Sequence, residues 1–200
     1  NFLVAIDFKD KHYALSYMDL STGEFKVTEL SEFSAVVGEI ASLKAREIVA
    51  GFTLDESQLK VFERQMNLLI SEQLEIPENL LIDLSGLTAL ENQVASKLLA
   101  YVKETQMRDL SHLQEVEHYE IKDFLQMDFA TKSSLELTAN KRENKKHGTL
   151  YWLLDETKTA MGTRMLRSWI DRPLVSNSAI QKRMEIVQIF LDHFFERSDL

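Results

Sequence analysis

Apolar and polar positions alternate along the first thirty residues of the chain. Residues 2–8 form a short apolar run, and residues 12–20 continue it with a period of two. This period is typical of β-strands. A polar turn that contains Gly23 follows, where glycine can adopt a positive φ, and a third strand begins at Phe25. The pattern predicts a meander of three strands.

From residue 31 the apolar period lengthens to between three and four residues, which is the period of a helix. Ser31 is a suitable N-cap for the first helix, and Asp55 begins a capping box for the second. Residues 87–102 form a longer helix with two apolar stripes. Short apolar runs at residues 47–52 and 67–71 lie between these helices and predict two further strands.

The predicted elements are three strands, then a helix, a strand, a helix, a strand and a helix. This is the element order of ribonuclease H-like domains, although a fold alone does not give a function. From about residue 120 every periodic segment is helical. We therefore expect an α/β ribonuclease H-like domain at residues 1–108 and an all-α segment at residues 109–200. The chain would then be α+β overall, with two domains.

The most informative helix signal lies between Thr159 and Arg172. Thr159 is a suitable N-cap, and apolar residues recur at intervals of four from Met161 to Trp169. Arg172 precedes Pro173, and a residue before proline is pushed out of the helical region, so the helix ends there. The stripe predicts packing rather than chemistry. If Trp169 is fully buried, Trp169→Ala should destabilise the fold by ~3–5 kcal/mol.

Three other helices are predicted in the second half of the chain. Asp128 is a candidate N-cap for the first of them, and Thr149 for the second. The third has a long apolar stripe, and its N-cap is one of Ser176, Asn177 or Ser178. The second half therefore has a different architecture from the first.

Charge is unevenly distributed along the chain, whose formal net charge is −9. Residues 1–100 carry 8 Lys/Arg against 16 Asp/Glu, whereas residues 101–200 carry 15 against 16. Nonspecific binding to a polyanion works by neutralising phosphates. The first half is therefore a poor candidate for binding nucleic acid.

The composition also limits the compartment and the kinds of site. No apolar run approaches the ~20 residues that a membrane helix needs, so no membrane partner is expected. The chain has no cysteine, which excludes disulfides and thiolate metal sites and fits a cytoplasmic location. It begins at Asn1, in a strand-like run without a signal peptide, which suggests an excised piece of a longer protein.

Asp7 is the sharpest catalytic candidate. In nucleases of the ribonuclease H class, an Asp of the first strand binds divalent metals together with carboxylates of later elements. Here the strand after the first helix reads Ile48-Val49-Ala50-Gly51, without an acid, and the last helix offers only Glu91 and Glu104. One carboxylate cannot hold two metals. We therefore interpret Asp7 as a strand-edge residue at a turn, and a metal-dependent nuclease is the alternative.

Other signals for catalysis or cofactor binding are weak. The five histidines show no metal-ligand spacing, and surface positions are the simpler interpretation. The sequence contains no G-x-x-x-x-G-K-[ST] or G-x-G-x-x-G phosphate loop and no G-x-S-x-G elbow. We predict no catalytic, cofactor-binding or metal site in this chain. The histidines are His12, His112, His118, His147 and His193.

A charged loop in the second half is a candidate for contact with DNA. Its basic residues are Lys141, Arg142, Lys145, Lys146 and His147. Charge runs of this size are more often solvated loops, which is the interpretation we favour. The alternative is a free-standing helical DNA-binding module. The tryptophans and methionines of the second half are interpreted as core or interdomain packing.

Four stretches resemble one known family. Residues 155–174 resemble the start of the helical core domain of the MutS family of DNA mismatch-recognition proteins. Residues 17–25 and 97–106 resemble its connector domain, and residues 124–137 resemble the entry to the core. The resemblance extends over essentially the whole chain and is greatest to members from streptococcal-type Gram-positive bacteria.

The resemblance implies a function without enzymatic chemistry in this piece. In the family, the connector has a ribonuclease H-like fold without nuclease activity, responds to nucleotide state and docks the partner MutL. The mismatch reader, the DNA clamp and the ATPase lie in other domains. ATP, Mg²⁺, mismatched DNA and a homodimer partner are therefore expected only for the full-length parent. This piece is expected to relay between mismatch binding and ATP state.

Overall fold

The computed structural model of the chain describes residues 2–106, 113–125, 127, 131, 134–142 and 145–193. The chain divides into two units, residues 1–120 and residues 121–200. The first unit thus continues beyond residue 108, where the sequence analysis places the boundary. The added segment belongs to it because the Tyr119 N–H donates to the Val27 carbonyl at 2.9 Å and the Tyr119 side chain is buried.

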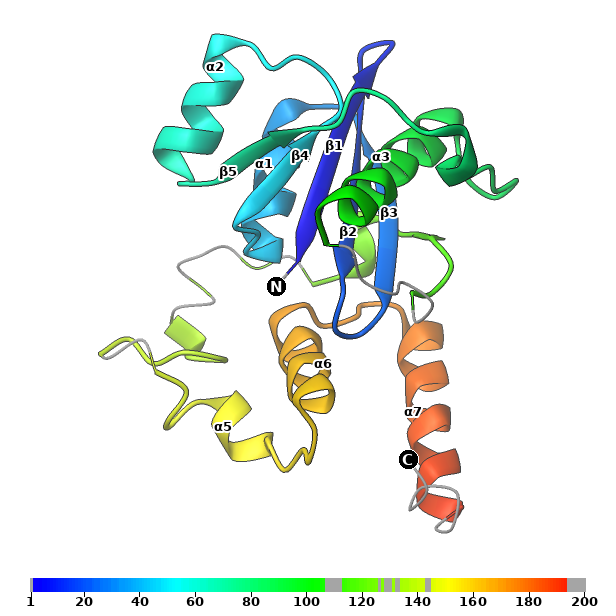
Figure 1. Cartoon of the computed structure of the whole chain (residues 1–200). Coiled ribbons are helices and arrows are strands. Elements are labelled where there is room, and N and C mark those ends of the chain that lie inside the picture. Colours follow the sequence, from blue (N-terminus) through cyan, green and yellow to red (C-terminus); the bar gives the residue numbers. More distant parts are fainter. Residues whose placement is uncertain are drawn as a thin grey trace. The chain divides into compact units, whose positions relative to one another are not determined.

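One six-stranded mixed sheet forms the centre of the first unit (Figure 1). Its strands are β1 (Leu3–Lys9), β2 (His12–Asp19), β3 (Glu24–Leu30), β4 (Glu47–Ala50), β5 (Leu69–Glu72) and β6 (Glu117–His118). β1, β2 and β3 are antiparallel neighbours, which confirms the predicted meander. β4 is parallel to β1, β5 to β4, and β6 to β3, so the order is β5-β4-β1-β2-β3-β6.

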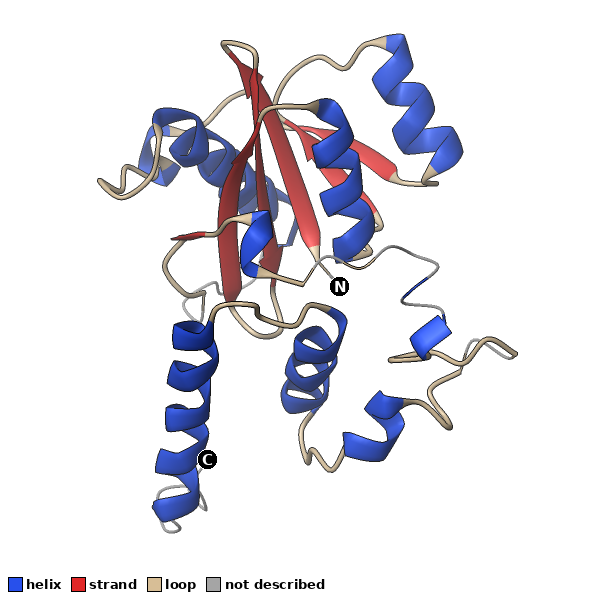
Figure 2. Ribbon diagram, turned by 180° about the vertical axis from the view of Figure 1, so that it is seen from behind, coloured by secondary structure: helices blue, strands red, loops and turns tan. Residues whose placement is uncertain are grey.

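Helices cover both faces of this sheet (Figures 1 and 2). They are α1 (Phe33–Leu43), α2 (Glu56–Leu59) with its π-helical continuation η1 (Lys60–Gln65), the 3-10 turn η2 (Glu78–Leu80) and α3 (Ala89–Gln106). Ala5 of β1 packs in the same buried cluster as Leu98 of α3. Because neighbouring strand residues point to opposite faces, Val4 and Ile6 are buried in the layer on the other side.

Local signals set the ends of these elements, with one exception. The capping box at Asp55 is confirmed. The Asp55 carboxylate accepts a hydrogen bond from the Gln58 N–H at 2.9 Å, and the Gln58 side-chain oxygen accepts one from the Asp55 N–H at 3.0 Å. Gly23 has a φ of 78°, as its turn requires. Ser31 does not cap α1: the extended residue before the helix is Glu32, and it makes no side-chain cap bond. Ser31 lies one residue before the cap position, and it is the side chain at the cap position that usually bonds the free N–H groups of the first turn.

The second unit contains η3 (Ile121–Asp123), α5 (Leu150–Leu154), α6 (Ala160–Asp171) and α7 (Asn177–Asp192). Thr149, Thr159 and Ser176 each accept a hydrogen bond from a backbone N–H three residues later, at 3.1, 3.0 and 3.5 Å. The first two caps are confirmed, and Ser176 is the one of three candidates that caps α7. The cap expected at Asp128 lies outside the described residues.

The second unit is not helical throughout. Phe124 and Leu174 form an antiparallel bridge, and the Leu125 N–H donates to the Pro173 carbonyl at 2.8 Å. Arg172, which ends α6, lies over the Phe124 ring at 4.2 Å. The expectation of an all-α segment therefore needs this correction. Alternation of apolar and polar residues could not predict this pairing, because it joins two short segments that are distant in sequence.

The apolar stripes of α6 and α7 remain accessible in this chain. The described residues of both helices include none that is buried. Met161 is 58% exposed, Met165 is 42% exposed, and Trp169 is half-buried beneath the Arg183 guanidinium at 4.0 Å. The core packing expected for these residues is not made here. The loss of ~3–5 kcal/mol required full burial of Trp169, so it does not apply.

Candidate functional site

Asp7, the candidate metal ligand, lies inside the first unit. It is on β1, with 1% of its surface exposed. Its Oδ2 accepts hydrogen bonds from the Lys97 Nζ and the Gln93 Nε2, both at 2.7 Å, and its Oδ1 accepts from the Phe8 N–H at 2.9 Å. Lys97 also donates to the Gly51 carbonyl at 2.6 Å. The carboxylate is therefore held in a buried ion pair.

The interpretation of Asp7 as a strand-edge residue at a turn is wrong in its physical detail. The side chain is buried against α3, and the Lys97 side chain is only 6% exposed. The sequence analysis missed Lys97 and Gln93. A signal was present: the two polar residues are four positions apart, one turn of a helix, and each is followed by an apolar residue of the buried stripe, Val94 and Leu98. A buried strand acid opposite such a pair predicts an ion pair.

Gly51 fits the space beside this ion pair because it lacks a side chain. A Cβ at this position would lie 2.8 Å from the Lys97 Cδ and 2.9 Å from the Asp7 Cγ. Gly51→Ala is therefore expected to lower the free energy of unfolding by about 1–3 kcal/mol. Chemical denaturation of the purified variant measures this.

Gly38→Ala is the matched control for Gly51→Ala. Gly38 lies in α1, and a Cβ there meets nothing within 4 Å. The same substitution should stabilise that helix by about 0.5–1 kcal/mol. A Gly51→Ala protein as stable as the wild type would contradict the close approach of Lys97 and Asp7.

Among the residues that the structure describes, no carboxylate cluster surrounds Asp7. Glu91 is 1% exposed and has other partners, the His118 Nδ1 at 2.6 Å and the Thr88 N–H at 2.9 Å. Glu104 is exposed on the last turn of α3. Within the described ranges, no three His, Asp or Glu side chains are arranged to hold a metal ion. A two-metal mechanism has no ligand set among these residues.

The histidines occupy unrelated positions. His12, His147 and His193 are exposed, and the His147 ring packs against Trp152 with centroids 4.5 Å apart. His112 lies outside the described residues. His118 is also at the surface, and its Nδ1 contacts the buried carboxylate of Glu91.

Residues 114–119, which we name the strap, fasten the end of the first unit to its sheet. The Gln114 N–H donates to the Gly23 carbonyl at 2.9 Å, and β6 pairs with β3. Neighbouring side chains then reach opposite layers: His118 contacts Glu91 of α3, and the Tyr119 hydroxyl donates to Glu39 of α1 at 2.8 Å. The strap therefore connects both helical layers to the chain that leads into the second unit.

Lys146 of the basic loop is engaged by groups of the same chain. The Lys146 Nζ donates to the Asp155 carboxylate and lies 4.7 Å from the centre of the Tyr151 ring. The Thr157 hydroxyl donates to the same carboxylate at 2.6 Å. These hydrogen bonds lower the pKa of Asp155 from 3.8 to about 2, and the bond from Lys146 has a larger effect than the bond from Thr157. Lys141 and Arg142 remain exposed.

Lys146→Met is expected to raise the pKa of Asp155 toward 3.8, since its main stabilising donor is lost. A carboxyl with a depressed folded pKa adds stability above its unfolded pKa, and this stability is lost as pH falls through the folded value. The Lys146 contribution should therefore disappear between pH 3.8 and about 2. NMR titration of the Asp155 carboxyl measures the shift. Lys141→Met is the control, and an unchanged Asp155 titration in Lys146→Met would contradict the pairing.

Comparison with known proteins identifies the family of this chain. The family model for MutS domain II matches residues 1–114, and that for MutS domain III matches residues 130–200. The chain belongs to the MutS family. Its resemblance to MutS, first drawn from four short stretches, is thereby confirmed. The strap lies largely between the two matched domains.

Several curated MutS proteins match this chain along its whole length. It is 95% identical over 200 residues to the DNA mismatch repair protein MutS of Lactococcus lactis subsp. cremoris (strain MG1363). It is 59% identical to that of Streptococcus gordonii and 60% identical to that of Streptococcus suis. In each case the chain covers 24% of the relative. The chain thus spans about a quarter of the length of these MutS proteins.

None of its described helices is both long and apolar enough to cross a membrane.

Proposed function

We propose that this chain is the connector and the first part of the helical core of a DNA mismatch-recognition ATPase. In this role it relays between mismatch binding and ATP state and docks a MutL-type partner. The proposal rests on the tandem matches to MutS domains II and III. Mismatched DNA and a second copy of the protein are the further partners of the longer parent, which works in the cytoplasm.

The first unit takes a ribonuclease H-like fold that serves as a scaffold. Three antiparallel strands are followed by two parallel ones, in the order β5-β4-β1-β2-β3, with helices on both faces. This arrangement supports the fold assignment. At the position where a nuclease would use an acid, Asp7 has its Oδ2 2.7 Å from the Lys97 ammonium. A fixed cation at that distance takes the place a divalent metal would need on the same oxygen.

The ATP and Mg²⁺ of the parent are bound outside this chain. A phosphate loop needs a glycine-rich turn followed by Lys and Ser or Thr, and the sequence has no such motif. The contribution of this chain to the ATPase cycle is therefore positional. The strap supports a relay because it joins α1, α3 and β3 to the chain that leads into the core.

Assays on the purified 200-residue chain test the absence of chemistry and the docking role. It should show no ATP hydrolysis and no Mg²⁺-dependent cleavage of DNA or RNA, and it should bind a purified MutL-type protein. Cleavage that is abolished by Asp7→Asn would establish the nuclease instead. Failure to bind the MutL-type protein would remove the docking role.

The relay is tested in the full-length Lactococcus lactis relative, which is 95% identical over this region. Tyr119→Phe removes the hydroxyl that reaches Glu39 and keeps the ring. It should leave mismatch affinity within about twofold of wild type while weakening the effect of mismatched DNA on nucleotide release. Unchanged coupling would contradict a relay through the strap.

A free-standing DNA-binding module has less support. One of its basic candidates, Lys146, is engaged with Asp155. Such a module predicts salt-sensitive DNA binding that falls when Lys145 and Lys146 are both replaced by Gln. DNA binding that is unchanged in this double variant would remove the module.

A further inference from the structure

Glu91, on the first turn of α3, contacts two different parts of the first unit. The residue is buried, with 1% of its surface exposed, and its two carboxylate oxygens have different partners. The Thr88 N–H donates to Oε2 at 2.9 Å, and the His118 Nδ1 lies 2.6 Å from Oε1. Because a carboxylate oxygen only accepts, the His118 Nδ1 carries the hydrogen. One side chain thus bonds both the start of a helix and the strap.

The bond to Thr88 belongs to a capping box at the start of α3. The Thr88 side-chain oxygen accepts from the Glu91 N–H at 3.1 Å, and the Thr88 carbonyl accepts from the Asn92 N–H at 2.9 Å. The Thr88 hydroxyl also donates to Glu29 of β3. A capping box satisfies N–H groups that the helix itself leaves free. The start of α3 therefore depends on how the Glu91 carboxylate is held.

The strap supplies this carboxylate with a donor from outside the helix. Removing one partner of a buried acceptor leaves that acceptor desolvated, which costs free energy unless water replaces the partner. If His118 moves away, water must reach the Glu91 carboxylate, and water then competes with the Thr88 N–H for it. Attachment of the strap and capping of α3 should therefore stabilise each other.

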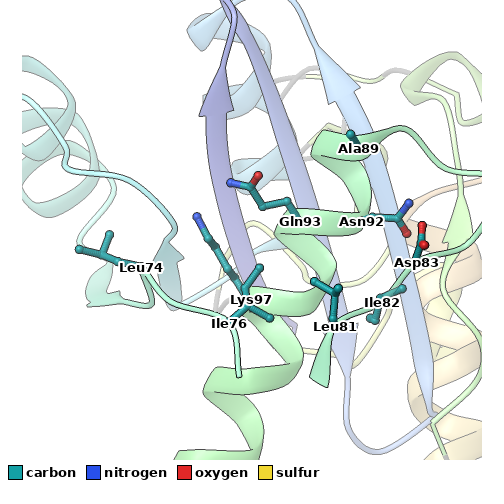
Figure 3. Close-up of a pocket in the computed structure, with 9 residues that line it drawn as sticks. All are labelled: Leu74, Ile76, Leu81, Ile82, Asp83, Ala89, Asn92, Gln93 and Lys97. Atoms are coloured by element: carbon teal, nitrogen blue, oxygen red, sulfur yellow. The ribbon is translucent and has the colours of Figure 1, made fainter. Parts of the chain in front are cut away.

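Other bonds hold the later turns of α3 independently of the strap. Gln93 and Lys97 extend from the same side of α3 (Figure 3), and both donate to Asp7 of β1 at 2.7 Å. They lie on the second and third turns of the helix, whereas Glu91 lies on the first. Loss of the Glu91 bonds should therefore loosen the first turn and leave the later turns folded.

We propose that Glu91 couples the strap to α3, so that detachment of the strap removes the cap of the helix and loosens its first turn. This inference rests on the proposed relay and names the residue through which the relay reaches α3. The side chains that carry it, Glu29, Thr88, Glu91 and His118, all belong to the first unit. The coupling is therefore measurable in this chain alone.

His118→Leu tests the coupling without disturbing the core. The His118 side chain is 44% exposed, so the variant should fold. Hydrogen exchange followed by NMR should show that the Thr88 and Glu91 amides lose protection at least about threefold, since a bond to a charged group is lost. The amide of Leu98, on the third turn, should be unchanged. His118→Asn keeps a donor close to the position of Nδ1 and should restore most of the protection.

Glu117→Gln is the matched control on the strap. Glu117 precedes His118 on β6, but its carboxylate pairs with Lys26 of β3 at 3.6 Å. The variant thus removes a charge from the strap and leaves the contact with Glu91 in place. Its Thr88 and Glu91 amides should exchange as in the wild type.

A second test runs in the opposite direction, because a coupling between two contacts is reciprocal. Thr88→Ala removes the capping hydroxyl, so it should speed exchange of the Tyr119 amide, which donates to the Val27 carbonyl at 2.9 Å. Thr105→Ala is the control. Its hydroxyl donates to the Tyr101 carbonyl at 2.8 Å near the other end of α3, and its loss should leave the Tyr119 amide unchanged.

The outcomes separate the coupling from the relay. Faster exchange of the Thr88 and Glu91 amides in His118→Leu, together with faster exchange of the Tyr119 amide in Thr88→Ala, supports the coupling. Unchanged exchange in either variant overturns it, as does an equal rise at Leu98, which would indicate general destabilisation. If the coupling holds while Tyr119→Phe leaves nucleotide release in the full-length relative unchanged, the coupling is supported and the relay is removed.

Discussion

Replacing Lys97 by Met is expected to lower the free energy of unfolding by about 3–5 kcal/mol. The side chains of Lys97 and Asp7 are 6% and 1% exposed, so the variant leaves a carboxylate inside the protein without its counter-charge. Methionine has nearly the same length as the lysine stem, which limits the loss of packing. Urea denaturation at neutral pH, followed by circular dichroism, measures the change.

Lys103→Met is the control for this substitution, because Lys103 lies on the same helix and is exposed. It should change stability by less than about 0.5 kcal/mol. The double variant Asp7→Leu, Lys97→Met should regain much of the loss, since removing both charges removes the desolvation cost of each. If Lys97→Met alone loses no more than Lys103→Met, the ion pair does not stabilise the unit.

Tyr119→Ala should have an effect of similar size, about 3–5 kcal/mol. The side chain is 3% exposed, its ring packs edge-on against Tyr17 at 5.4 Å, and its hydroxyl donates to Glu39. The variant removes the anchor of the strap on the α1 layer. Denaturation measures the stability, and hydrogen exchange of residues 114–119 measures release of the strap.

Tyr119→Phe separates the ring from the hydroxyl. It should cost about 1 kcal/mol, the usual net contribution of one hydrogen bond. Strap exchange should then rise only slightly, whereas Tyr119→Ala should raise it strongly. Slow strap exchange in Tyr119→Ala would show that the backbone pairing of β6 holds the strap without this side chain.

Periodicity and capping predicted the elements whose causes are local. The β1–β3 meander, the capping box at Asp55, the caps at Thr149 and Thr159 and the stop before Pro173 each depend on residues within a few positions of one another. Steric and hydrogen-bonding preferences at that range are readable from the chain. These parts of the fold therefore followed from the sequence.

Contacts between distant residues were not predictable in the same way. Lys97 lies 90 residues from Asp7, so the residues around Asp7 do not reveal which side chain pairs with it. The strap is mostly polar and its strand β6 has two residues, too few for a period of two to predict it. The stripes of α6 and α7 show which face is apolar, but periodicity does not reveal whether another part of the same chain covers that face.

The two-sided attachment of the strap has a mechanical consequence. A strand held on one face only can swivel about its backbone hydrogen bonds. The strap is held from both sides, because His118 contacts Glu91 of α3 and Tyr119 donates to Glu39 of α1. The segment therefore resists torsion about its own axis as well as tension along it. Torque on the backbone at Tyr119 is therefore transferred to β3, the strand with which this segment pairs.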